Sequence, residues 1–167
     1  MKYILILLFI TYSILSFGQE YNVRRAYYDN GQLKKEDNYK GSKFHGLRKR
    51  WHENGQLRFE CNYKDGKQNG SVTLWYENGQ LDEEKNYKDG VKDGLQREWY
   101  ENGQLMFEYN LKDGKPIDGI IRGYYENGQL MKETNYKDGH KEGLQREWHK
   151  NGQLKYERNY KNGVQID

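Results

Sequence analysis

The sequence predicts an all-β protein: an elongated, twisted, single-layer antiparallel meander sheet built from tandem β-hairpin repeats of about 24 residues. Two observations carry this prediction. A block resembling WYENGQL occurs six times, with Asn-Gly pairs that begin at residues 30, 54, 78, 102, 127 and 151. Each block is followed by a second turn dipeptide, Asp-Gly or Asn-Gly in five of the six. Short runs rich in Tyr, Trp and Leu between such dipeptides are typical of hairpins, and two turns per block give about eleven or twelve strands.

Residues 1–18 stand apart from the repeats. Lys2 precedes an apolar run over residues 3–17, and Ser16 and Gly18 are small residues where a cleavage site requires them. We expect a secretory signal peptide over residues 1–18 and a single repeat domain of about six hairpin units over residues 19–167. An uncleaved anchor is the alternative, but the run is short for a bilayer core that needs ~20 residues. The expected location is therefore the periplasm, the envelope or the medium.

The composition limits the kind of core that the chain can build. Apolar residues make up 34% and charged residues 32%, while aromatic residues reach 15% with 16 Tyr. High charge with low apolar content is typical of disorder, but this aromatic content argues against it. Rings must then supply most of the buried area. Cys61 is the one cysteine, so no intramolecular disulfide is possible; we expect a small buried side chain, with a reactive thiol as the alternative.

The turns decide which residues share a face of the sheet. A two-residue Asn-Gly loop would pair His52 with Leu57, whereas a three-residue loop over residues 53–55 pairs Trp51 with Leu57. The longer loop separates apolar from polar side chains better, so we prefer it and expect Gly55 to be left-handed. The same loop applied to residues 64–66 places these side chains on one face: Leu57, Phe59, Cys61, Tyr63 and Trp75.

We expect this ring-bearing face to be the binding surface. A single layer leaves its apolar stripe half exposed unless the sheet coils, pairs or binds a partner. The candidate residues are Trp51, Trp75, Trp99, Tyr124, Trp148, Tyr63, Tyr87, Tyr136, Phe59 and Phe107. Two positions between these rings alternate by unit, with Phe59/Cys61 in the second unit and Lys35/Asp37 in the first. The extra residue of the fifth block falls in residues 115–119, beside the only proline, and predicts a turn there.

The block W-Y-E-N-G-Q-L-x-x-E-x-N-Y-K-D-G resembles the variant MORN repeat (membrane occupation and recognition nexus) over residues 27–163. The resemblance implies an elongated twisted sheet and a binding or scaffolding role. Bacterial chains of this kind are often labelled antitoxin components of a toxin–antitoxin module. An exported protein cannot neutralise a cytosolic toxin. The version of this function that agrees with the signal peptide is an immunity-type role in the envelope.

No pattern in the sequence indicates catalysis, a cofactor or a metal site. The Glu three residues after each repeat Leu recurs in all six units, but neighbouring copies would lie ~9.6 Å apart, too far to share one ion. We expect a cross-strand ladder of these Glu residues with Lys and Arg instead: Glu36, Glu60, Glu84, Glu108, Glu133 and Glu157. The recurrent Asn of the Asn-Tyr pair is expected to stabilise the following turn.

The expected partner is another protein. Charge is uneven, at +4 over residues 30–53 and −3 over residues 78–101, which is unlike the broad basic surface that nucleic acids require. A net charge of +3 gives little electrostatic support for membrane contact. The alternative function is a carbohydrate- or choline-binding surface, because Trp-Tyr-x-Asn-Gly repeats also resemble cell-wall-binding repeats. A choline cage needs three rings that converge from adjacent units.

Overall fold

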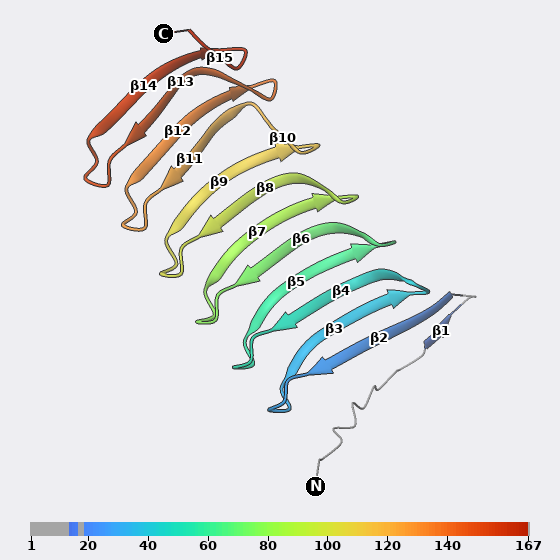
Figure 1. Cartoon of the computed structure of the whole chain (residues 1–167). Helices are drawn as coiled ribbons and strands as arrows, with labels where there is room; N and C mark the ends of the chain where they lie inside the picture. Colours follow the sequence, from blue (N-terminus) through green and yellow to red (C-terminus); the bar gives the residue numbers. More distant parts are fainter. Residues whose placement is uncertain (1–13, 17–18, 167) are drawn as a thin grey trace.

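The chain folds into one open antiparallel sheet (Figure 1). The computed structural model describes residues 14–16 and 19–166. Along the sheet the strands follow chain order, and β10 pairs with β9 outside that path. The strands are β1 (Ile14–Ser16), β2 (Gln19–Tyr27), β3 (Leu33–Lys40), β4 (Lys43–Trp51), β5 (Leu57–Lys64), β6 (Lys67–Trp75), β7 (Leu81–Lys88), β8 (Val91–Trp99), β9 (Leu105–Lys112), β10 (Lys115–Pro116), β11 (Gly119–Tyr124), β12 (Leu130–Lys137), β13 (His140–Trp148), β14 (Leu154–Lys161) and β15 (Val164–Gln165).

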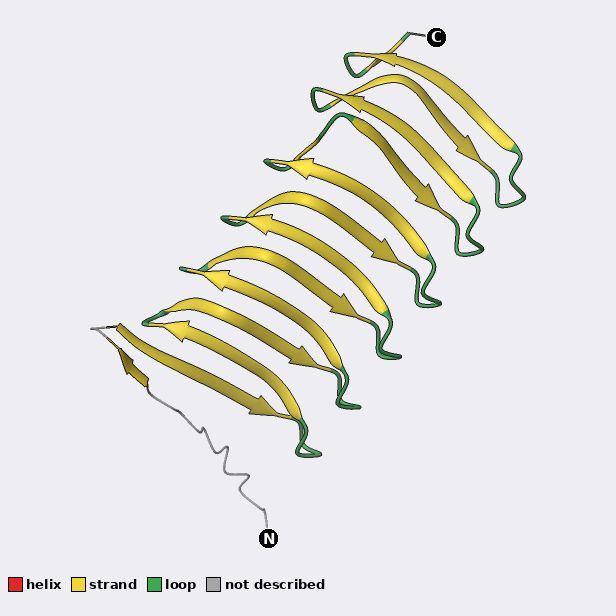
Figure 2. Ribbon diagram, turned by 180° about the vertical axis from the view of Figure 1, so that it is seen from behind, coloured by secondary structure: helices red, strands yellow, loops and turns green. Residues whose placement is uncertain are grey.

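The long strands run up and down as successive hairpins, and each is bent in the same sense (Figure 2). The predicted all-β meander is confirmed, and β1, β10 and β15 are short additions of two or three residues. Within the described residues no helix occurs, so none is long and apolar enough to cross a membrane. Of the predicted signal peptide, only Ile14–Ser16 is described, as a strand paired with β2. The remainder lies outside the described residues, and its cleavage stays a prediction.

The first turn of each hairpin is the three-residue loop that the sequence predicts. Trp51 pairs with Leu57. His52 N–H donates to the Gln56 carbonyl at 2.8 Å, and Gly55 N–H donates to the His52 carbonyl at 3.0 Å. Gly55 has a φ of 88°, the left-handed conformation that glycine adopts without steric cost.

The second turn is one residue shorter than predicted. Lys64 pairs with Lys67, so the loop holds only Asp65 and Gly66, with φ values of 50° and 87°. Positive φ at both positions defines a type I′ turn, whose twist matches that of the flanking strands, and Asp tolerates this conformation better than most residues. The prediction of a three-residue loop over residues 64–66 is therefore wrong.

A bulge follows this turn and resets the register of the hairpin. Tyr63 pairs with Gln68, but Cys61 then pairs with Val72. Because successive side chains of a strand point to opposite faces, Val72 shares the face of Cys61 and Trp75 lies on the other one. The prediction that Trp75 shares a face with Cys61 is wrong because the second turn is one residue shorter than expected; the bulge then shifts the pairing by two residues and leaves the faces unchanged.

We call the face that carries Cys61 the inner face, because every side chain described as buried lies on it by register. Its small apolar core consists of Cys61, Val72 and Leu111, and the buried polar side chains are Asp37, Gln96, Thr134 and Gln145. Cys61 is completely buried, as predicted, and burial raises the pKa of its thiol. The buried core of this one-layer sheet is thus a narrow central row of side chains.

The opposite, outer face carries the ladder of Glu residues that the sequence predicts. Arg97 contacts Glu84 at 3.4 Å and Glu108 at 2.7 Å, so one guanidinium joins two repeats. Arg146 likewise contacts Glu133 and Glu157. The Glu residues of the first two units pair with Arg25 and Lys49. All six recurrent Glu side chains are therefore committed to cross-strand ion pairs.

The insertion before the fifth unit interrupts the sheet locally. Pro116 of β10 pairs with Leu111, and Ile117 N–H donates to the Asn110 carbonyl. β11 begins only at Gly119 and pairs with β9 at two positions, Arg122 with Glu108 and Gly123 with Phe107. The turn lies at residues 113–114 rather than within residues 115–119 as predicted, and Lys115–Pro116 form the short strand β10. The insertion shortens the contact between the fourth and fifth repeats.

Candidate functional site

The candidate binding residues divide between the two faces. Each Trp, or the Tyr that replaces it, pairs with the repeat Leu across the first turn, as Trp75 does with Leu81. A register shift lies just before each of these pairs, as between Leu74 and Trp75, so each ring points away from the inner-face residue that precedes it. These five therefore lie on the outer face: Trp51, Trp75, Trp99, Tyr124 and Trp148. The other five lie on the inner face: Phe59, Tyr63, Tyr87, Phe107 and Tyr136. The single aromatic face expected from the sequence is therefore two different surfaces.

The first-turn residues hold neighbouring repeats together. Tyr76 Oη donates to the Trp99 carbonyl at 2.7 Å, and Asn78 Nδ2 donates to the Glu101 carbonyl at 2.9 Å. The Asn78 Oδ1 atom also accepts from Gln80 N–H at 2.9 Å. Bonds equivalent to that of Tyr76 are made by Tyr28, His52, Tyr100 and Tyr125. We call this series the loop ladder. Its tyrosines already bond the next repeat, which leaves the Trp-Tyr pair poorly placed to form a choline cage.

A row of tyrosines on the inner face lies opposite glycines. Tyr63 pairs with Gly46, Tyr87 with Gly70 and Tyr136 with Gly119, so each ring faces a position without a side chain. These rings are only half-buried. Burial raises the pKa of Tyr87, with Glu83 adding to the increase and Lys85 opposing it. The row therefore offers ring surface that the fold leaves partly exposed.

Basic side chains gather on the inner face of the first two repeats. Arg48 Nε and Arg50 Nη1 contact the same oxygen of Asp37, at 2.9 and 2.7 Å. Burial favours the neutral form of Asp37, but the two guanidinium groups outweigh it and hold its pKa below the usual value. A hollow of ≈ 390 Å³ beside them is lined by Arg48, Arg50, Arg58, Phe59 and Leu74. We call Lys35, Arg48, Arg50 and Arg58, with Asp37, the basic patch.

The third repeat carries the reverse arrangement of charge. Lys85 Nζ contacts Glu83 at 2.5 Å and Glu98 at 3.5 Å. Burial opposes the charge of Lys85, but these carboxylates raise its pKa above the usual value. Glu83 and Glu98 lie directly opposite each other across β7 and β8. We call these three residues the acidic patch.

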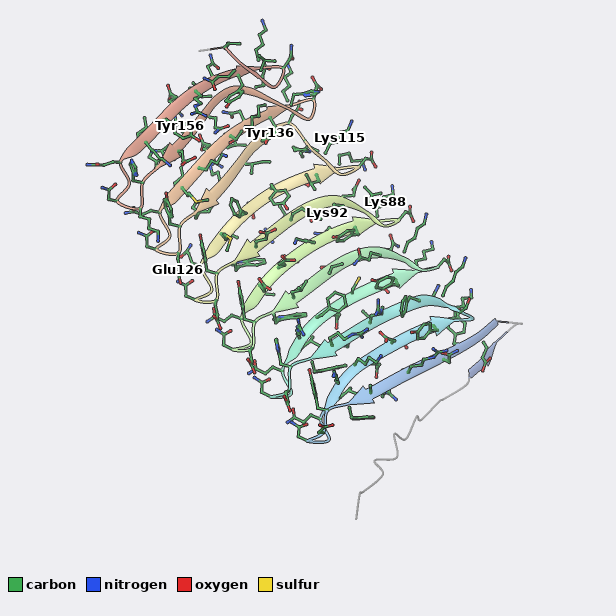
Figure 3. The ribbon with its side chains drawn as sticks, in the orientation of Figure 1. Lys88, Lys92, Lys115, Glu126, Tyr136 and Tyr156 are labelled. Carbon is green, nitrogen blue, oxygen red and sulfur yellow. The ribbon has the colours of Figure 1, made fainter. Side chains whose placement is uncertain are left out.

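Rings return on the inner face of the later repeats. Phe107 and Tyr136 line a smaller hollow of ≈ 150 Å³ together with Ile121, Gly123, Lys132 and Thr134. Farther along, Glu147 accepts hydrogen bonds from Lys155 at 2.7 Å and from Tyr156 at 2.6 Å, which lower its pKa. Figure 3 shows Tyr136 and Tyr156 in this later part of the sheet. Phe59 and Phe107, two candidate residues, thus belong to two separate hollows.

The alternation of the repeats appears on the inner face. The second and fourth units place Phe59 and Phe107 on the inner face, whereas the first and third place Lys35 and Glu83 at the equivalent positions. Charged groups on the odd units and rings on the even units therefore give a striped surface. The alternation between units was the sequence signal for the two patches, but it could not show which residues of neighbouring strands pair with each other.

The recurrent Asn of the Asn-Tyr pair bonds to the following strand rather than within its turn. Asn38, Asn86 and Asn135 donate through Nδ2 to the carbonyls of Leu47, Leu95 and Leu144, at 2.5–2.7 Å. These carbonyls lie beside the glycine bulges, where the ladder of backbone bonds shifts register. In these three units the expectation that the Asn stabilises the turn is corrected to a role at the bulge.

The fold and its repeating contacts define a tandem β-hairpin repeat protein. The sequence profile described as "MORN repeat variant" matches residues 21–40, 44–65, 68–89, 92–113, 117–138 and 141–162, and the chain belongs to this family. MORN repeats are generally non-enzymatic modules that bind proteins or membranes. A comparison with curated proteins found no match. Among the described residues, no group of three or more His, Cys, Asp or Glu could hold a metal ion.

Proposed function

We propose that this protein is a non-enzymatic scaffold of the cell envelope that binds a partner protein on its inner face. One contrast carries the proposal. The outer Glu residues and the first-turn loops are already bonded to neighbouring repeats, whereas the inner face presents half-buried rings between patches of opposite charge. Aromatic rings and arginines are the residue types enriched at protein interfaces.

The envelope location rests on the sequence of residues 1–18, with its basic start, apolar run and small residues at the expected cleavage site. A narrower version is an immunity-type protein that masks a secreted toxin. The family resemblance supports it, and a toxin domain encoded in the neighbouring gene would strengthen it. The first two repeats supply the positive charge that an acidic partner would need.

Site-specific photo-crosslinking tests the choice of face. A photoreactive phenylalanine is placed either at Phe59, on the inner face, or at Leu57, at the start of the same strand but paired with Trp51. The full chain is expressed in the source cells and irradiated. We expect a discrete protein adduct from position 59 only. Adducts from position 57 alone would reject the inner face, and the absence of any adduct would reject the scaffold.

The carbohydrate alternative is tested separately. Choline, chitin and glucan fragments are titrated while Trp fluorescence is recorded. We expect no change in Trp fluorescence at millimolar ligand, because the Trp and the inner-face Tyr residues lie on two different surfaces and the first-turn tyrosines already bond the next repeat. A saturable change would instead favour a ligand-binding surface.

A further inference from the structure

The basic patch holds more positive charge than the fold itself neutralises. Lys35 and Arg50 lie directly opposite each other across β3 and β4, an arrangement of like charges that destabilises a sheet. Asp37 is the patch's own carboxylate, and it already contacts both Arg48 and Arg50. In the described part of the chain, neither Lys35 nor Arg58 forms an ion pair or side-chain hydrogen bond. The basic patch thus holds four cations and one carboxylate, and only Arg48 and Arg50 contact that carboxylate.

The shape of the site suits a carboxylate attached to an apolar stem. Arg48 is fixed in place, since its guanidinium lies 3.8 Å from the centre of the Phe44 ring and 5.1 Å from that of Tyr63. Arg58 has no such fixed partner and lines the hollow with Phe59 and Leu74. The planar guanidinium fork matches a carboxylate with two parallel hydrogen bonds.

The acidic patch lies two repeats farther along the same face. Corresponding strands of the two patches are four strand spacings apart, about 19 Å. Phe59, Leu74 and Val72 separate the patches as an apolar strip. Glu83 and Glu98 form a like-charge pair with only Lys85 between them, so this patch keeps a net negative charge.

We propose that the inner face binds an acidic protein segment whose carboxylates contact the basic patch and which carries a basic group about 19 Å away for the acidic patch. This inference rests on the proposed function and identifies the partner of that same face. A nucleic acid or an anionic membrane fits worse, because a uniformly negative ligand that reaches both patches is repelled by Glu83 and Glu98.

Labelled synthetic peptides test this pattern on the full-length protein by fluorescence anisotropy at low salt. One peptide carries six Glu residues. A second joins six Glu to four Lys through a Gly-Ser spacer of about six residues, which spans ~20 Å when extended. A ten-nucleotide single strand and vesicles of phosphatidylcholine with phosphatidylglycerol are the competing probes. We expect the mixed peptide to bind several-fold more tightly than the Glu peptide, and both more tightly than the other probes.

Matched charge reversals locate the binding. Arg58→Glu should weaken binding of the Glu peptide about tenfold, because it replaces an attraction with a repulsion. Lys64→Glu makes the same charge change on the same strand, outside the hollow, and should alter binding less than about twofold. Glu98→Lys should abolish the advantage of the mixed peptide, while Glu101→Lys, in an exposed loop, should retain it. Circular dichroism verifies folding, and Arg58→Gln is a milder second variant with a smaller loss.

Equal losses in Arg58→Glu and Lys64→Glu would overturn the proposal, as would tighter binding of the oligonucleotide or the vesicles. Failure of both peptides would also overturn it. If neither peptide binds but position 59 still crosslinks to a protein, the scaffold function stands and only the proposal of an acidic partner is rejected. If no crosslink forms either, both proposals fall.

Discussion

Replacing Asn78 by Asp tests whether the first-turn Asn joins neighbouring repeats. Asn78 makes two contacts: its Oδ1 accepts from Gln80 N–H within the turn, and its Nδ2 donates to the Glu101 carbonyl of the next repeat. Asp keeps the first contact and loses the second. A net hydrogen bond contributes about 0.5–1.5 kcal/mol, and a carboxylate oxygen facing a carbonyl oxygen adds repulsion. We expect Asn78→Asp to lower the free energy of unfolding by about 1 kcal/mol.

Urea unfolding followed by Trp fluorescence measures this loss, which corresponds to roughly 2–4 °C in Tm for a chain of this size. The same change at Asn54, Asn78 and Asn102 together should cost about three times as much, since separate repeats contribute nearly additively. Asn151→Asp is the matched control, because within the described residues the Nδ2 of Asn151 donates to no further repeat. A stability for Asn78→Asp equal to that of the unmodified protein would refute the inter-repeat role and leave the Asn as a local turn residue.

Three further predictions concern the turn, the buried carboxylate and the thiol. Gly55→Val should cost about 2 kcal/mol more than Gln56→Val, because a β-branched residue is strained at positive φ and its Cβ would lie 2.9 Å from Gln32 Oε1; equal losses in urea unfolding would count against the loop. The folded-state pKa of Asp37 lies below its unfolded value. The ionised carboxylate of Asp37 therefore stabilises the folded protein above the unfolded pKa, and this stabilisation is lost as pH falls through the folded pKa. The stability difference between the unmodified protein and Asp37→Asn should therefore shrink on acidification towards pH 3, and a constant difference in urea midpoints would contradict this. Cys61 should react with a maleimide only on unfolding, and rapid labelling of the native protein would disprove its burial.

The sequence specifies the fold closely because each turn has its own chemistry. At Asn54-Gly55 the three-residue loop separates apolar from polar side chains best, and the structure has Gly55 in the expected left-handed conformation. The second turn shows where this reasoning fails. Asp65-Gly66 closes as a two-residue turn and is followed by a bulge near Gly70, and these two departures together change the pairing of Cys61. Glycine in a strand can mark a bulge, but its position in the register is set by the strands on both sides.

The candidate site was predictable in composition but not in arrangement. The sequence identifies the rings and their alternation with charged residues. A register change of one residue reverses every side chain, so assigning Trp75 and Phe59 to one face depended on a single loop length. The opposition of Lys35 to Arg50 and of Glu83 to Glu98 becomes visible only when strands are paired. The outer ladder was easier to predict, because the spacing of the Glu residues is independent of that choice.

The pairing of Cys61 with Val72 decides which residues form the inner face, and one engineered disulfide tests it most directly. Paired residues on antiparallel strands have Cα atoms about 4.5–5.5 Å apart, within the range that a disulfide spans. With Cys61 as the chain's own thiol, Val72→Cys should crosslink on mild oxidation, as detected by mass spectrometry of peptides, and Asn69→Cys should not. A disulfide in Asn69→Cys but not in Val72→Cys would place Trp75 on the inner face and contradict the division of the two surfaces.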